Sequence, residues 1–211
     1  MKKLVLMLMA AMMLTTANAQ ELTKQQAKAV TKEVKKKLKD YKQRGYEIFG
    51  SSRTLESALT KHYTQLEAKD GKIVEVTGFS QAKSRNLAAT AAQNSASNRY
   101  ATTSSQQIKA RILADMSNDV SNQEAEFDKF YAVFEGKVQQ EITGELRQSF
   151  AVAKQNADGT ISVEAYFLVD DDAASRARRN ALKNSQEESA IAQKYAQKLS
   201  DFVNERVVPE Q

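Results

Sequence analysis

The sequence predicts an α+β fold in which a small sheet, of about three to four strands, is covered by long helices. A strand–turn–strand pattern near residues 146–169 indicates a hairpin, and a β-branched run at residues 72–79 indicates another strand. Most other segments repeat apolar residues at helical spacing. The chain has 211 residues, 41% of them hydrophobic and 27% charged, and its mean hydropathy is −0.57. This composition is typical of a globular protein, and we expect residues 46–211 to form a single α+β domain.

The first 19 residues have the three parts of a secretory signal peptide. Lys2 and Lys3 form a basic start, an unbroken apolar run extends from residue 4 to residue 14, and Ala17-Asn18-Ala19 provides a small-x-small cleavage site. The apolar run is shorter than the ~20 residues that a membrane-spanning helix needs. No lipobox cysteine is present. The pattern therefore predicts a bacterial protein that is periplasmic or secreted, with a cleaved signal peptide and no transmembrane helix.

Residues 20–45 are expected to form a basic amphipathic helix. Its apolar residues recur mostly every three or four positions and fall on one side, whereas the other side is rich in lysine. This apolar side consists of Leu22, Ala27, Val30, Val34, Leu38 and Tyr41. Gly45 is expected to end the helix. A second helix is expected over residues 55–68, with Leu55, Leu59, His62 and Leu66 along one stripe.

The strand at residues 72–79 is followed by a predicted helix over residues 81–103. Ala88, Ala92 and Ala96 recur every four residues there, and small side chains at this spacing let a helix lie close against a sheet or another helix. Residues 106–117 fit a helical period and also a strand period, so the sequence leaves both alternatives open.

The remaining elements complete the predicted fold. Aromatic residues at helical spacing predict a helix over residues 125–142. A turn at Asn156–Gly159 is expected to join the two hairpin strands, the second of which covers residues 160–169. The three aspartates at positions 170–172 are expected to cap one long terminal helix over about residues 172–206.

The segment from Val74 to Ala101 reads VEVTGFSQAKSRNLAATAAQNSASNRYA. A strand ending in a glycine, then an arginine followed by alanines every fourth residue and a closing Tyr-Ala, resembles the bacterial LPP-twenty envelope lipoprotein family and its flagellar outer-membrane relatives. The resemblance covers about residues 72–172. It implies a compact α+β envelope domain used for assembly or surface association, without catalysis. The chain departs from that family because it lacks the lipidated cysteine, which argues against tethering to the outer membrane.

Several kinds of chemistry are excluded by the residues that the chain lacks. It has no cysteine, which excludes disulfides, thiolate metal sites and cysteine nucleophiles, and its single histidine excludes a site with two imidazoles. No GxSxG, GxxxxGK[ST] or GxGxxG motif occurs. His62 is interpreted as a hydrogen-bonded histidine at the edge of the core, and the aspartates at 170–172 as a helix cap. The sequence therefore predicts no catalytic residue, cofactor or metal.

Charge is segregated along the chain. Residues 21–44 carry nine basic and three acidic side chains, whereas residues 115–172 carry four basic and 13 acidic ones. One interpretation is that the lysine side attracts an anionic envelope component, such as lipid headgroups, lipopolysaccharide or another envelope protein. The other is that it is a solvated face or docks on the acidic region of the same chain. The candidate partner-binding residues are Lys28, Lys32, Lys35, Lys36, Lys39 and Lys42.

Two functions from different classes follow. The first is a non-catalytic, exported envelope or periplasmic module for interaction or assembly. The alternative is a hydrolase with a carboxylate-based site that uses His62 together with acidic residues such as Asp171. Glu187 and Glu188 do not suit that role, because adjacent residues on a helix point in different directions. Nucleic acid is not an expected partner, since no aromatic residues alternate with the lysines.

Overall fold

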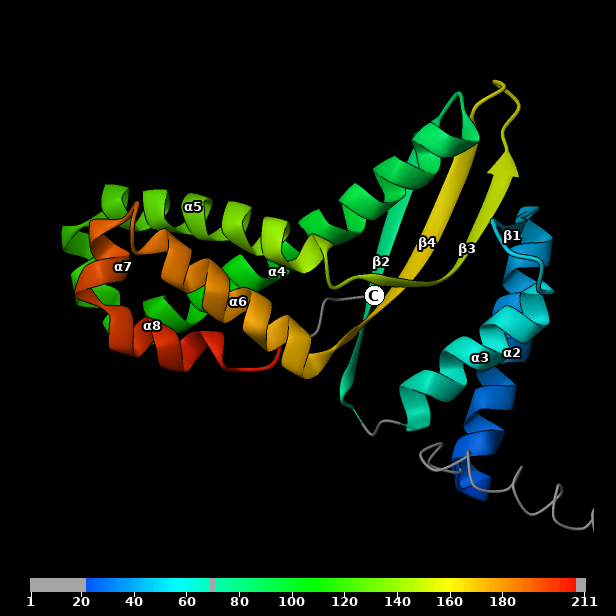
Figure 1. Ribbon diagram of the computed structural model, residues 1–211, viewed down its shortest axis with the longest axis horizontal. Coiled ribbons are helices and arrows are strands. Elements are labelled where there is room, and N and C mark those ends of the chain that lie inside the picture. Colours follow the sequence, from blue (N-terminus) through cyan, green and yellow to red (C-terminus); the bar gives the residue numbers. More distant parts are fainter. Residues whose placement is uncertain (1–21, 69–70, 208–211) are drawn as a thin grey trace, which may run out of the picture.

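The computed structural model describes residues 22–68 and 71–207, and it confirms the α+β fold (Figure 1). The signal peptide expected at residues 1–19 lies outside the described residues. One sheet has the strand order β1-β3-β4-β2, and each neighbouring pair is antiparallel. The strands are β1 (Glu47–Phe49), β2 (Ile73–Ala82), β3 (Arg147–Gln155) and β4 (Ile161–Asp170). The helices are α2 (Lys24–Arg44), α3 (Leu55–Ala68), α4 (Arg85–Asn122), α5 (Glu124–Thr143), α6 (Asp171–Ser185), α7 (Ala190–Lys194) and α8 (Ala196–Val203).

The first half of α4 covers one face of the sheet (Figure 1). Its predicted stripe of alanines at positions 88, 92 and 96 is buried against β2. Gly78 of β2 makes this close approach possible, because a Cβ atom there would lie 1.8 Å from the carbonyl oxygen of Ala92. The hydroxyl of Ser80 also donates a hydrogen bond to the carbonyl oxygen of Ala88 at 2.5 Å. The small residues of this segment therefore serve packing, as the sequence predicts.

Beyond the sheet, the second half of α4 packs with α5 to α8 in a helical layer (Figure 1). Residues 106–117 belong to α4, which settles the alternative that the sequence left open. Ile108 and Ile112 are buried in the main core, as the helical period requires. Met116 is also buried, but its φ of −140° is not helical, so α4 kinks at that residue.

The opposite face of the sheet carries α2 and α3 over a second, smaller core. On α2 this core contains Val30, Val34 and Tyr41, and Leu22 and Leu38 pack against it, which confirms most of the predicted apolar side. Ala27, which was predicted on that side, is exposed instead. Its other buried members come from α3, from the two central strands and from the segment after α2. They are Tyr46, Ala58, Leu59, Phe150, Val152 and Tyr166. Helix α2 therefore packs onto the domain and does not project from it (Figure 1).

The hairpin is confirmed, with β3 and β4 joined by a turn at Asn156–Gly159. Gly159 has a φ of 78°, which lies in the left-handed region that favours glycine. The short strand β1 was not predicted, because three residues are too few to show a period. It adds to β3 through a register that pairs Ile48 with Val152.

The prediction of one terminal helix over residues 172–206 is wrong, since three helices occupy this segment. Helix α6 ends at Ser185. Ser189 is the N-cap of α7, and its hydroxyl accepts a hydrogen bond from the amide of Ala192. Glu187 and Glu188 lie in the intervening turn and not on a helix. The chain folds back because Arg178 of α6, fully buried, donates to the carbonyl oxygens of Val203 and Glu205.

Candidate functional site

A strongly basic surface of the described chain is built on α2. Thr23 begins this helix with a capping box, in which its hydroxyl accepts from the amide of Gln26 at 3.3 Å and its own amide donates to the Gln26 side chain at 3.0 Å. Gly45 ends the helix with a φ of 73°. The two caps fix a straight segment of 21 residues whose apolar side is buried, so its opposite side must face outward.

Six exposed lysines run along that outward side, and we call them the lysine stripe. They are separated by three or four residues, so at 3.6 residues per turn they fall within an arc of about 80° and extend over about 27 Å. The lysine stripe consists of Lys24, Lys28, Lys32, Lys35, Lys39 and Lys42. Five of these belong to the predicted set, and Lys24 adds the N-terminal end. The sixth predicted residue, Lys36, is exposed but lies beside the stripe.

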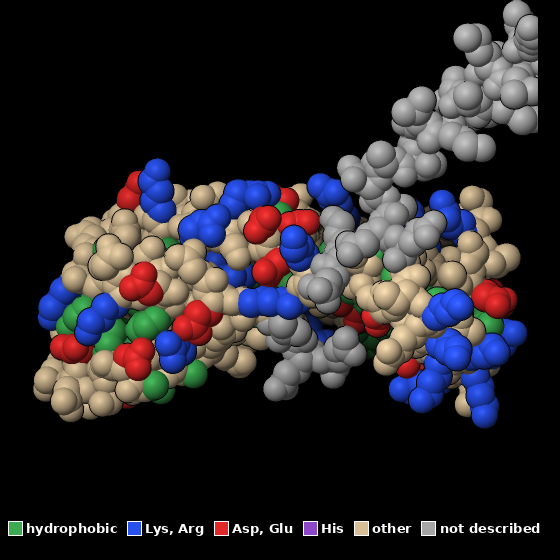
Figure 2. Space-filling model, turned by 90° about the horizontal axis from the view of Figure 1, so that it is seen from below, with side chains coloured by type: hydrophobic (Ala, Val, Ile, Leu, Met, Phe, Trp, Pro, Cys, Tyr) green, Lys and Arg blue, Asp and Glu red, His purple; other side chains and the backbone are tan. Residues whose placement is uncertain are grey.

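The acidic residues of α2 do not neutralise the lysine stripe. Glu33 pairs with Lys36 at 3.6 Å, and Asp40 pairs with Arg44 at 3.1 Å. Within residues 22–68 and 71–207, no lysine of the stripe makes an ion pair. The ion pair that joins α2 to the acidic region 115–172 is formed by Arg44 and Glu164. Docking of the lysine side on the chain's own acidic region is therefore not what the structure shows. Figure 2 shows Lys and Arg side chains gathered at the end of the molecule that α2 and α3 form.

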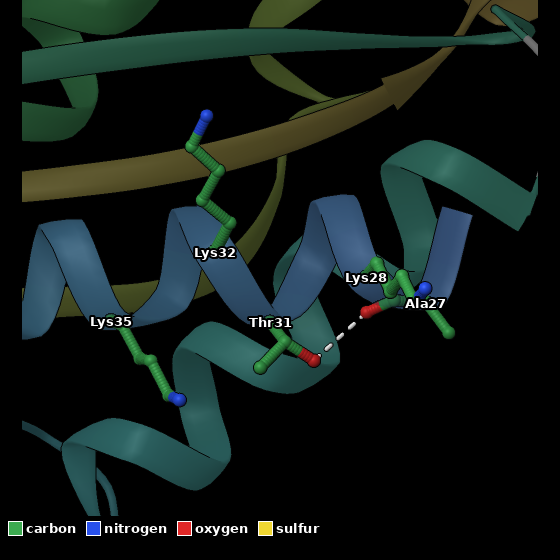
Figure 3. Close-up of a pocket in the computed structure, with 5 residues that line it drawn as sticks. All are labelled: Ala27, Lys28, Thr31, Lys32 and Lys35. Carbon is green, nitrogen blue, oxygen red and sulfur yellow. Dashed lines mark hydrogen bonds between the residues drawn. The ribbon is translucent and has the colours of Figure 1, made fainter. Parts of the chain in front are cut away.

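A shallow hollow of about 450 Å³ interrupts the lysine stripe near its N-terminal end. Its lining residues are Ala27, Lys28, Thr31, Lys32 and Lys35 (Figure 3). The hydroxyl of Thr31 donates to the carbonyl oxygen of Ala27 at 2.8 Å, which holds this side chain against the helix. In Figure 3 the Lys32 and Lys35 side chains extend to opposite sides of the helix, so the hollow does not gather the ammonium groups at one point.

His62 is the second candidate, and the structure places it between α3 and the sheet. The imidazole is fully buried. Its Nε2 lies 2.5 Å from Oε2 of Glu75 on β2, and its Nδ1 lies 3.0 Å from Oγ of Ser149 on β3. The interpretation of His62 as a hydrogen-bonded histidine is therefore confirmed, whereas Asp171 makes no contact with it. Asp171 instead lies 3.8 Å from Arg206.

Aromatic rings surround this imidazole. Phe150 and Tyr166 stack on each other with centroids 4.5 Å apart and planes at 4°, and the His62 ring meets both edge-on, at 5.0 Å and 5.9 Å. Tyr63 approaches the ring from α3 at 5.1 Å. Burial raises the pKa of Tyr166 to about 12, and burial likewise raises the pKa of Tyr63. These phenols therefore stay neutral near neutral pH.

The aspartates at positions 170–172 begin α6, as the sequence predicts. Asp170 is the N-cap of α6, and its side chain accepts from the amide of Asp172 at 3.1 Å. Among the described residues, no group of three or more His, Asp or Glu side chains could hold a metal ion. No helix of the described part is long and apolar enough to cross a membrane.

Sequence reasoning missed Glu75 and Ser149, the partners of His62. Glu75 gave one signal, since it interrupts the apolar run of a strand that is otherwise half-buried. Ser149 gave none, because its position depends on a shift of the β3–β4 register between Gln148 and Phe150. The chain matches no family model, no curated protein and no solved structure.

Proposed function

We propose that the protein is an exported interaction or assembly module of the bacterial cell envelope, periplasmic or secreted, and that it binds an anionic envelope component through the lysine stripe. One observation carries this proposal. Six lysines share an exposed side of α2, while the two described acids of that helix are paired with cations outside the stripe. Binding of this kind needs no reaction chemistry. Export rests on the signal-peptide pattern of residues 1–19.

The packing of α2 restricts how it meets a membrane. An interfacial amphipathic helix buries its apolar side among lipid chains. In this protein that side, with Val30, Val34 and Tyr41, is already buried against the rest of the domain. The lysine stripe must therefore act by charge alone, at the level of the headgroups, and its binding should weaken strongly as salt is added.

The composition of the stripe favours phosphate-bearing headgroups over an acidic protein. Protein interfaces depend on a few buried aromatic or arginine anchors. The large hydrophobic side chains that are exposed in the described chain are Phe79, Leu87 and Leu113, and none of them lies on α2. Lysine is a compact point charge that suits diffuse contact with phosphates. The resemblance of residues 72–172 to the LPP-twenty envelope family agrees with such a role and stays a prediction.

The test is vesicle binding by two variants that lose equal charge. One carries Lys32→Gln, Lys35→Gln and Lys39→Gln within the stripe. The control carries Lys83→Gln, Lys183→Gln and Lys198→Gln, three exposed lysines on other parts of the surface. At about 1 kcal/mol per lysine near an anionic surface, the stripe variant should bind phosphatidylglycerol vesicles about 100-fold more weakly at low salt. The control should bind them nearly as the natural protein does.

Two results would reject the proposal. One is equal loss in both variants, which would mean that net charge and not the stripe is responsible. The other is binding to neutral phosphatidylcholine vesicles that does not change with salt. Export is tested separately, by fractionating bacteria that express the full chain. We expect the periplasm or the medium to contain a protein that begins at Gln20, and a cytosolic protein that retains Met1 would contradict this.

A further inference from the structure

Glu75, His62 and Ser149 form a hydrogen-bonded chain that the binding role of α2 does not use. An ionised carboxylate can only accept hydrogen bonds, so in the neutral imidazole the proton must lie on Nε2, facing Glu75. Nδ1 then carries a lone pair, and the hydroxyl of Ser149 must donate to it across 3.0 Å. A serine hydroxyl that donates to an imidazole, itself oriented by a carboxylate, is the arrangement that activates a serine nucleophile.

The surroundings hold this chain in place. The rings of Phe150, Tyr166 and Tyr63 pack edge-on against the imidazole and restrict its rotation. Ser149 lies where the β3–β4 register shifts, and such irregularities re-aim side chains at the margins of sheets. His62 is fully buried, whereas Ser149 is partly exposed. The hydrogen-bonded chain therefore leads from a fully buried imidazole to a serine residue that is partly exposed.

We propose that Ser149 is a nucleophile activated by His62, with Glu75 as the positioning residue, and that it accepts the acyl group of small esters. In this step Oγ of Ser149 bonds to the ester carbonyl carbon while its proton moves to Nδ1 of His62. The carbon–oxygen bond to the alcohol then breaks, and the alcohol leaves with the proton from Nδ1. Water, deprotonated by the same nitrogen, releases the acid and regenerates Ser149.

The hollow on α2 does not include Ser149. Small activated esters and fluorophosphonates are the appropriate probes, because their reaction needs little more than a reactive hydroxyl. In the usual Ser-His-Asp arrangement, Nε2 of the histidine faces the serine and Nδ1 faces the aspartate. In this protein Nδ1 faces Ser149 and Nε2 faces Glu75, and the proton transfer is chemically equivalent.

The decisive experiment treats the folded full chain with a fluorophosphonate and maps the label by peptide mass spectrometry. His62 is the single histidine of the sequence, so every other serine is an internal control without an imidazole. We expect labelling of Ser149 to be at least about 100-fold faster than that of the other serines, the usual effect of a general base. Labelling of Ser149 no faster than theirs overturns the proposal, and this result needs no variant.

Variants assign the roles. Ser149→Ala should remove the label, and His62→Gln should slow it about 100-fold while the near-ultraviolet spectrum of the tyrosines is retained. If His62→Gln fails to fold, the pH profile of the natural protein replaces it. The titratable groups near the ring are Glu75 of β2, Tyr63 of α3 and Tyr166 of β4, and Glu33 of α2 acts on Tyr63.

Because burial raises the pKa of Tyr63 and of Tyr166, neither phenol ionises between about pH 5 and pH 9. A labelling rate that rises with pH in this range is therefore not due to either phenol. Glu75→Gln should change the pH at which the rate rises, an effect that a purely structural role would not produce. A rate independent of pH would overturn the assignment of His62 as the base.

Discussion

The hydroxyl of Tyr41 on α2 donates a hydrogen bond of 2.7 Å to the hydroxyl of Tyr166 on β4. Both side chains are buried, and the bond joins the helix that carries the lysine stripe to the centre of the sheet. Stable packing of α2 and partner binding by α2 can therefore be tested independently. The residues that hold the helix in place lie on one side, and the residues proposed to bind a partner lie on the other.

The first prediction concerns this bond. Tyr41→Phe leaves the ring in place but leaves the buried hydroxyl of Tyr166 without its donor, so we expect a loss of about 1–2 kcal/mol in the free energy of unfolding, measured with urea. Binding to anionic vesicles should not change, because no lysine of the stripe is altered. A variant that loses vesicle binding while remaining folded would show that the stripe and this bond are not independent.

The second prediction concerns alkaline pH. Burial raises the pKa of Tyr166 from its ordinary value of 10.0 to about 12. The folded state therefore favours the neutral phenol, and this contribution to stability is present below pH 10 and is lost as the pH rises toward 12. Urea unfolding at about pH 8 and at about pH 11, with tyrosinate absorbance as a second signal, should show the decrease. The decrease should be smaller in Tyr166→Phe, and an equal decrease in that variant would assign it to other tyrosines.

The third prediction concerns the contact between α4 and β2. In Gly78→Ala the new methyl group would meet the backbone oxygen of Ala92, which cannot move without displacing the helix. We expect a loss of about 3 kcal/mol or more, or failure to fold. Gly136→Ala is the matched control, because nothing lies within 4 Å of the new methyl group and alanine is the better helix former. That change should stabilise the protein by up to about 1 kcal/mol in thermal unfolding.

The fourth prediction concerns the C-terminal segment. Arg178→Met leaves the carbonyl oxygens of Val203 and Glu205 without their buried donor, so we expect a loss of about 3–5 kcal/mol. Hydrogen exchange should become faster over residues 196–207 before it does so in the sheet. Arg176→Met is the control, since Arg176 of the same helix is exposed and should change stability by no more than about 0.5 kcal/mol. Similar losses in the two variants would contradict the anchoring role of Arg178.

The proposed binding surface could be read from the sequence because it depends on a single helix. The spacing of Val30, Val34 and Tyr41 fixes which side of α2 is buried, and the lysines must then face away from it. The stripe of small residues opposite β2, the β3–β4 hairpin and the cap at Asp170 are likewise local patterns. Each was predicted because its signal lies within one short stretch of sequence: the spacing of the small residues, the residues of the turn, and the type of the capping residue.

The tertiary structure decided the relationships between elements that are distant in the sequence. It showed that residues 106–117 are helical, because Ile108 and Ile112 are buried in the main core in that conformation. It also showed that the C-terminal segment folds back onto Arg178. It also brought Glu75 and Ser149 to His62 from two strands. Such pairs depend on how helices and strands pack and on one register shift, and no periodicity within a segment encodes them.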